Sequence, residues 1–153
     1  MFMKKIFLLL TLLCAGLYSQ AQTAASYGFS AFTAPYSSIA GSGTMLPLLS
    51  DDDVTELSVP IGFTFNYCGT PYTTTSICTN GWISLSNSPA IDWTNISALI
   101  DGPGWIMPFW DDIEGFTAGS VYYQTTGVAP NRVFTVEWNA FESLVGFGTF
   151  AVG

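Results

Sequence analysis

The stretch IGFTFNYCGTPYTTTSICTNGWISLS, residues 61–86, decides the fold class of this chain. Its first arm alternates large apolar residues, including Phe65 and Tyr67, with small or polar ones, which is the period of a strand with one buried face. Residues 69–72 carry turn-forming Gly and Pro, and a threonine-rich run then continues to Ile77. The stretch therefore predicts neighbouring antiparallel strands of an extracellular-type, all-β protein.

Similar short apolar runs recur along the rest of the chain. We expect strands at residues 27–31, 105–110, 120–126 and 133–141, with another beginning near residue 146. Pro108 indicates an edge or bulged strand, and residues 87–104 are mainly loop, with at most one helical turn at 97–100. Without an amphipathic helix, this pattern favours an antiparallel β-sandwich or jelly roll. Because a strand is beginning where the sequence stops, we expect a domain truncated at its C-terminal end.

The first 21 residues read as a secretory signal. Lys4 and Lys5 precede an apolar run at residues 6–17, which is too short to span a bilayer, and small residues at 19 and 21 suit cleavage. The alternative is a lipoprotein signal that uses Cys14, although this cysteine follows leucines rather than small residues. We expect one domain over residues 22–153, secreted or on the outer cell surface, and periplasmic if no sorting domain follows.

Charge and composition exclude several functions. Without residues 1–21 the chain keeps Arg132 as its only basic residue against 11 acidic ones, so nucleic acid and anionic membrane surfaces are poor partners. No membrane insertion is expected after signal cleavage. The absence of histidine from the sequence excludes histidine-based triads and metal ligands. Aromatic residues make up 16% of the chain and charged residues only 9%, which argues against disorder.

Cys68 and Cys78 form a candidate disulfide, as expected for an exported pair. The geometry leaves two alternatives. In a tight hairpin that turns at residues 69–72, Cys68 faces Thr73 and Cys78 lies roughly 16 Å further along the strand, too far for a bond. A wide turn would allow the disulfide. We favour the tight hairpin.

Several motifs resemble a known family. They are YxFS, GFTF followed by a turn, CTNGWISL, MPFWDD and GSVYYQTTGxAPNRxFTVEW, in residues 27–30, 62–65, 78–85, 107–112 and 119–138. The set resembles the β-rich N-terminal modules of large secreted Bacteroidetes proteins exported by type IX secretion and, more distantly, the nidogen-type extracellular domain. The resemblance implies a surface or secreted β-sandwich module, often joined to adhesive repeats and a sorting domain, and it supplies no catalytic residues.

The sequence WDDIE, residues 110–114, is the best candidate for chemistry. If it is a strand, Asp112 and Glu114 share a face with Trp110, a layout similar to that of laminarinase-type β-glucanases. Trp110 would then occupy the position of the nucleophile, and it cannot attack an anomeric carbon. An acidic strand end and turn is therefore the favoured interpretation, and we expect no enzyme activity.

Calcium is the one cofactor that the acidic residues suggest. Asp111, Asp112 and Glu114, and separately the run at residues 51–53, could supply oxygen ligands in loops of a secreted sandwich. Neither run has the spacing of an established calcium loop. Solvation of a loop or protection of a sheet edge explains both runs without a metal.

Tryptophan side chains are the third candidate site. Trp82 falls opposite Ile83 in the alternation, and Trp93 lies in the long loop, so we expect these two rings to be exposed and able to stack on sugars. Trp110 is included as a candidate ligand-binding residue. Trp138 shares the core face with Phe134 and is expected to be structural.

Together these features predict an exported, non-enzymatic β-sandwich module. It would serve adhesion or structural presentation in a larger cell-surface or secreted protein, with an extracellular protein or glycan as partner. The alternative is a carbohydrate-binding module that uses exposed tryptophans, with or without calcium.

Overall fold

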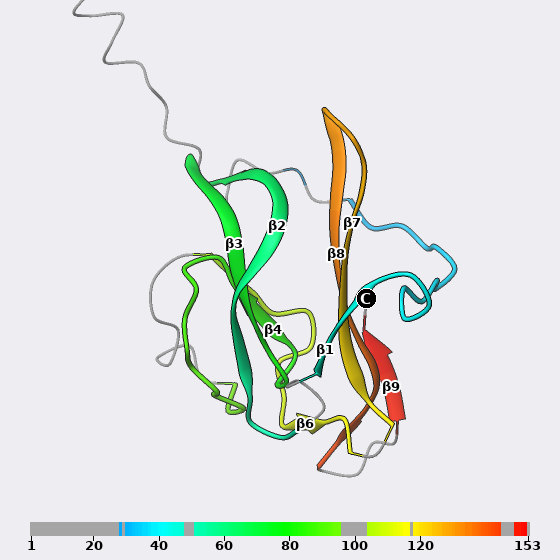
Figure 1. Cartoon of the computed structure of the whole chain (residues 1–153). Coiled ribbons are helices and arrows are strands. Elements are labelled where there is room, and N and C mark those ends of the chain that lie inside the picture. The colour runs from blue at the N-terminus through cyan, green and yellow to red at the C-terminus, as the bar shows by residue number, and fades with distance from the viewer. Residues whose placement is uncertain are drawn as a thin grey trace, which may run out of the picture.

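A computed structural model of the chain describes residues 28, 30–47, 51–95, 104–116, 118–144 and 149–152. These residues form nine strands and no α-helix. The strands build two antiparallel sheets that face each other, which confirms the predicted all-β sandwich (Figure 1). No helix within the described ranges is long and apolar enough to cross a membrane. The signal at residues 1–21 and the helical turn expected at 97–100 lie outside the described residues.

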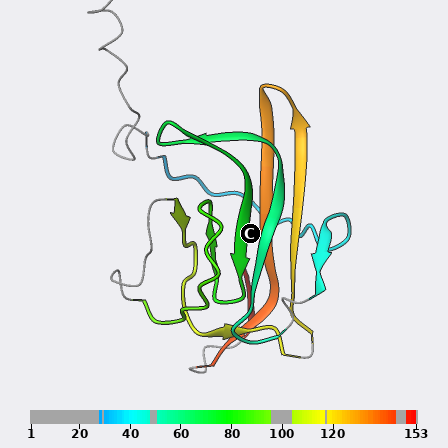
Figure 2. The same ribbon diagram turned by 60° about the vertical axis from the view of Figure 1, so that its left-hand side comes forward.

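The first sheet has the order β1-β7-β8-β6, and β9 also pairs with β8. Its strands are β1 (Thr44–Leu46), β6 (Ile113–Glu114), β7 (Ser120–Val128), β8 (Asn131–Ser143) and β9 (Thr149–Val152). The second sheet has the order β2-β3-β4-β5. Its strands are β2 (Thr55–Tyr67), β3 (Thr70–Cys78), β4 (Trp82–Ser84) and β5 (Trp105–Ile106). Figure 2 shows the long β2–β3 and β7–β8 hairpins reaching toward the same end of the sandwich.

The β2–β3 hairpin turns one step earlier than the sequence suggested. Tyr67 pairs with Thr70, so the turn consists of Cys68 and Gly69, both with positive φ. Two positive φ angles are what a two-residue hairpin turn needs to match the strand twist. The hairpin is therefore tight, as predicted, and the expected turn at residues 69–72 with Cys68 facing Thr73 is wrong.

This register also shows whether Cys68 and Cys78 can form a disulfide. Cys78 pairs with Thr55 at the opposite end of β2 from Cys68, and no disulfide joins the two cysteines. Cys78 is fully buried, and its burial raises the pKa of the thiol to about 11. Cys78 is therefore a core residue, and the alternative of a wide, disulfide-linked turn is wrong.

The main core lies between the two sheets. Val59 and Ile77 of the second sheet meet Val121, Trp138 and Phe141 of the first, and all five are buried. The indole Nε1 of Trp138 donates a hydrogen bond across the sandwich to the carbonyl of Cys78, at 2.8 Å. The prediction that Trp138 is a structural core residue is confirmed.

Two expected strands differ from the structure. At residues 27–31 the described positions, 28, 30 and 31, are not in a strand. The chain that follows is instead held by side-chain hydrogen bonds to Glu137, rather than by a strand partner. The strand expected at residues 105–110 ends at Ile106, since Pro108 has no backbone N–H to donate to a neighbouring strand.

Candidate functional site

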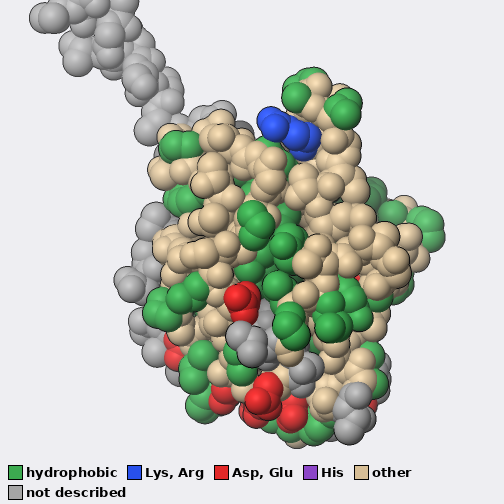
Figure 3. All heavy atoms as spheres, viewed as in Figure 1, with side chains coloured by type: hydrophobic (Ala, Val, Ile, Leu, Met, Phe, Trp, Pro, Cys, Tyr) green, Lys and Arg blue, Asp and Glu red, His purple; other side chains and the backbone are tan. Residues whose placement is uncertain are grey.

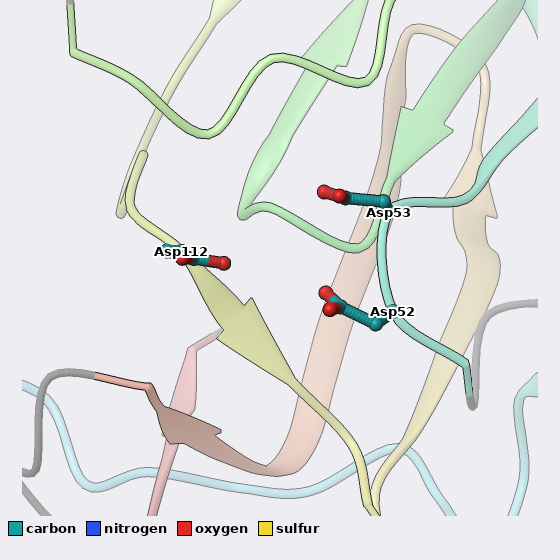
Figure 4. Close-up of side chains that lie close together, drawn as sticks. All are labelled: Asp52, Asp53 and Asp112. Atoms are coloured by element: carbon teal, nitrogen blue, oxygen red, sulfur yellow. The ribbon is translucent and has the colours of Figure 1, made fainter.

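Two acidic loops that are far apart in the sequence meet at one end of the sandwich. Asp52 and Asp53 lie in the turn before β2, and Asp112 lies just before β6. Carboxylate oxygens of the three residues lie within 4.8 Å of one another. Figure 4 shows the side chains of Asp52 and Asp53 extending toward Asp112 from the neighbouring loop. We call these three residues the acidic cluster.

A buried asparagine holds the two loops together. Asn80, which is fully buried, donates from Nδ2 to Asp53 Oδ1 at 2.8 Å, and its Oδ1 accepts from the backbone N–H of Ile113 at 3.3 Å. The next residue, Gly81, has a φ of +74°, and a Cβ there would meet the carbonyl oxygen of Phe109 at 1.9 Å. The pair Asn80-Gly81, which lies within the CTNGWISL motif of residues 78–85, therefore positions the acidic cluster.

The cluster holds more negative charge than its hydrogen bonds compensate. Burial, followed by the negative charges of Asp53 and Asp51, raises the pKa of Asp52. Burial, followed by the charges of Asp52 and Asp53, likewise raises the pKa of Asp112. Asp52 Oδ1 is buried and has no hydrogen-bond partner among the described residues. Since a cation would offset both the repulsion and the unsatisfied oxygen, the residues present fit a bound metal ion.

The composition of the cluster differs from the predicted metal site. Of Asp111, Asp112 and Glu114, only Asp112 takes part in it. Asp111 Oδ1 instead accepts a hydrogen bond from the backbone N–H of Asp112, at 2.9 Å. Burial, followed by the charges of Asp52 and Asp51, raises the pKa of Glu114, but its carboxylate is not one of the three that lie together. Each acidic run was visible in the sequence, and their contact was not.

The strand needed for a glucanase-like arrangement does not form. Within residues 110–114 only Ile113 and Glu114 are in a strand, and Trp110 and Asp112 precede it. The alternating layout that would place Trp110, Asp112 and Glu114 on one strand face is therefore wrong. The acidic turn that was favoured in its place agrees with the structure.

Two of the three candidate tryptophans lie in the core. Trp82 is fully buried and Trp110 is 7% exposed, and both indole Nε1 groups donate to the carbonyl of Asp92, at 3.1 and 2.8 Å. The expectation that Trp82 is exposed is wrong because the loop after β4 folds back over it. Trp93 is 45% exposed, as predicted, and it is the one candidate ring available to a ligand in the described chain.

A groove that the sequence did not indicate lies between the sheets. One part, with a volume of about 300 Å³, and a neighbouring part of about 270 Å³ share Ile83, Ile106 and Phe134 in their walls. The remaining walls are apolar except for Arg132, whose guanidinium lies 4.8 Å from the centre of the Phe63 ring. Figure 3 shows hydrophobic side chains along the middle of this face, the basic side chain near its top and most of the acidic side chains near its bottom. We call this feature the inter-sheet groove.

Comparison with known proteins gives one match. No curated protein and no solved structure matches the chain significantly. A family model described as NIDO related matches residues 26–149, which is most of the chain and includes every strand up to β8. The chain therefore belongs to the NIDO-related family, and its β-sandwich is a nidogen-like extracellular domain.

Proposed function

We propose that this domain is an exported, non-enzymatic module that serves adhesion or structural presentation in a larger cell-surface or secreted protein. The observation that carries the proposal is the family match over residues 26–149. The motifs also resemble modules of Bacteroidetes proteins exported by type IX secretion, and we propose that route of export. Function then depends on the surfaces that the sandwich presents to a partner, an extracellular protein or a glycan.

Attachment of cells tests this proposal directly. Deletion of the gene should lower attachment of the source bacterium to surfaces coated with extracellular-matrix protein or glycan, and the intact gene should restore it. Protease treatment of whole cells should remove the domain, since we expect it outside the outer membrane. Unchanged attachment of the deletion strain, or a protease-resistant domain, would contradict the proposal.

The absence of enzyme activity needs its own test. Trp110 and Asp112 precede β6 and do not share a strand face with Glu114, so the alternating layout of a β-glucanase is missing, and this supports a non-enzymatic role. The mature domain incubated with a β-glucan should release no reducing sugar. Sugar release that disappears in Glu114→Gln would identify a glycanase and overturn this part of the proposal.

A glycan-binding role is the second candidate, favoured by the exposed ring of Trp93. The other four tryptophans are at most 9% exposed, so a polysaccharide that quenches tryptophan fluorescence must act mainly through Trp93. Quenching by laminarin that is lost in Trp93→Ala would support this role. Phe116→Ala is the matched control, because that ring is also 45% exposed and should leave the quenching unchanged.

A further inference from the structure

A buried carboxylate lies on the outer face of the first sheet. Glu137 of β8 comes directly before Trp138, whose ring lies in the core between the sheets. Because successive side chains of a strand point to opposite faces, Glu137 points away from this core. A glutamate is rarely buried unless polar groups surround it, yet Glu137 is only 1% exposed. A segment outside the sheet therefore covers its side chain.

This segment is the part of the chain that leads to β1. The carboxylate of Glu137 accepts hydrogen bonds from the hydroxyl of Tyr36, from Ser38 Oγ at 2.7 Å and from the backbone N–H of Ile39 at 2.6 Å. Figure 1 shows the segment, coloured blue to cyan, passing β7 and β8 on the side away from β2 and β3. We call residues 30–39 the strap.

The strap buries little surface of its own. Residues 30–38 are all exposed, and none of them is in a strand. Phe32 is 85% exposed, and Tyr36 is 58% exposed although its hydroxyl reaches Glu137. A segment with few buried apolar side chains and no strand partner opens at a lower free energy than the fold as a whole. The hydrogen bonds to Glu137 therefore hold the strap in place.

The sandwich does not use the strap to form its core. Leu46 is the first residue of the described chain that belongs to the main core. The turn between the strap and β1 closes on itself, because the backbone N–H groups of Ser42 and Gly43 donate to the carbonyl of Ile39 at 2.9 and 2.6 Å. β1 then pairs with β7 from Thr44 onward. Detachment of the strap would therefore leave both sheets and the core in place.

We propose that the strap opens and closes on the folded sandwich, with Glu137 as its anchor, and controls access to the outer face of the first sheet. Tyr122 lies opposite Glu137 across the β7–β8 pair, and Met45 lies opposite Tyr122 across the β1–β7 pair. The three side chains therefore form one row on this face. Glu137 is 1% exposed and Met45 is 48% exposed, so the closed strap covers one end of the row. Opening adds Glu137 to the accessible surface.

The open state leaves no buried charge without a partner. Asn139 of the same strand donates from Nδ2 to Glu137 Oε1 at 2.9 Å, and this hydrogen bond does not involve the strap. Water replaces the strap at the remaining positions of the carboxylate, and it also hydrates the groups that the strap releases. Opening therefore exchanges hydrogen bonds with the strap for hydrogen bonds with water. The latch is independent of the proposed adhesive role, because it is a property of the folded domain.

Native-state hydrogen exchange measured by NMR on residues 22–153 tests the proposal. The amide of Ile39 reports the latch directly, since it donates to Glu137. We expect this amide to be protected and to exchange at least about 10-fold faster than the slowest amides of the β7–β8 pair. Low concentrations of urea should accelerate the β7–β8 amides and leave the Ile39 amide nearly unchanged, because opening of the strap exposes little surface.

Variants identify the anchor. Glu137→Gln should accelerate exchange of the Ile39 amide at least about 10-fold, because hydrogen bonds to a charged acceptor are lost. Ser38→Ala removes one donor and keeps the carboxylate, so about 5-fold is expected, and it provides a second test if Glu137→Gln does not fold. Ser37→Ala is the matched control, because this neighbouring serine is exposed and is not one of the donors to Glu137. Its exchange rate should stay within about 2-fold of wild type.

Chymotrypsin gives a second measurement within the strap itself. It cleaves after aromatic residues, and the exposed Phe32 should be cut in the closed state. Cleavage after Tyr36 requires release from Glu137. Glu137→Gln should therefore raise the rate of cleavage after Tyr36 several-fold and leave the rate after Phe32 unchanged.

Three results would overturn the proposal. If the Ile39 amide exchanges at the rate of an unfolded peptide, the strap is not latched. If it exchanges at the rate of the β7–β8 amides and with the same dependence on urea, the strap opens only when the whole domain unfolds. If Glu137→Gln and Ser38→Ala both leave its exchange unchanged, Glu137 is not the anchor.

Discussion

Glu137 and the acidic cluster differ in how their carboxylates are hydrogen-bonded. Glu137 is only 1% exposed, yet its oxygens accept hydrogen bonds from Tyr36, Ser38, Asn139 and the backbone of Ile39. In the acidic cluster, by contrast, carboxylates lie against one another, and a buried oxygen of Asp52 has no partner among the described residues.

The pKa shifts have opposite signs for this reason. Burial alone would raise the pKa of Glu137, but the hydrogen bonds from Tyr36, Asn139, Ser38 and Ile39 outweigh it and lower the pKa. In the cluster, burial and neighbouring negative charges act in the same direction and raise the pKa of Asp52 and of Asp112. Donors make a buried carboxylate structural, and their absence leaves charge that a ligand can use.

The largest expected effect is the loss of Glu137. Glu137→Gln removes the charge and replaces one acceptor oxygen with a donor, so the donors of residues 36–39 lose their partner. We expect a loss of about 2 kcal/mol in the free energy of unfolding at neutral pH. Urea denaturation measures it. Glu142→Gln, an exposed glutamate of the same strand, should change stability by less than about 0.5 kcal/mol. Equal losses of stability in the two variants would show that the hydrogen bonds to Glu137 do not make it more important for stability than an exposed glutamate.

The contribution of Glu137 should also depend on pH. Because its pKa is lowered in the folded state, its stabilisation is fully present above the unfolded-state pKa of about 4.3 and is lost as the pH falls through the folded-state value. The stability difference between wild type and Glu137→Gln should therefore shrink in urea denaturation at acidic pH. A difference that grows on acidification would contradict this assignment.

The sequence predicted the strands better than the contacts between loops. The alternation of apolar and polar residues in residues 61–67 and 133–141 identified β2 and β8. A strand with one buried face requires an apolar residue at every second position, so its pattern is visible in the sequence. The acidic cluster could not be predicted from a pattern of this kind. Asp52 and Asp112 meet only because the loops before β2 and β6 converge on Asn80, and no local pattern encodes a contact across about 60 residues.

Burial of Trp82 shows the same limit. Alternation correctly placed it on the face opposite Ile83, and the error was to leave that face uncovered. The carbonyl of Asp92 and the rings of Trp105 and Trp110 cover it, and these contacts come from later loops and from β5. The inter-sheet groove depends in the same way on how the two sheets meet.

Calcium should stabilise the domain through the acidic cluster. Asp52, Asp53 and Asp112 would hold the ion with their carboxylates, and water would complete its coordination. With an affinity typical of extracellular modules, millimolar calcium should add about 1 kcal/mol and raise the Tm by a few degrees. Scanning calorimetry with calcium, magnesium or chelator measures this. A Tm that does not change with calcium would leave the cluster without a metal role.

A smaller effect on stability is expected from removing one of the charges that repel one another in the acidic cluster. Asp112→Asn should stabilise the calcium-free domain by about 0.5 kcal/mol at neutral pH and should abolish the response to calcium. Because the pKa of Asp112 is raised in the folded state, the ionised carboxylate destabilises the fold above that value, and this cost disappears as the pH falls below the unfolded-state pKa. Asp92→Asn, outside the cluster, is the control and should keep the calcium response. If Asp112→Asn instead destabilises the calcium-free domain, repulsion within the acidic cluster does not limit its stability.

The most direct test of the contrast is a carboxyl-carbon NMR titration of residues 22–153 without calcium. The carboxyl signals of Asp52, Asp112 and Glu137 are followed in one experiment. Each signal is assigned by its absence in the corresponding asparagine or glutamine variant. The account predicts that Glu137 titrates below the usual range for glutamate and that Asp52 and Asp112 titrate above the usual range for aspartate. Normal or lowered values for both aspartates, or a raised value for Glu137, would contradict it.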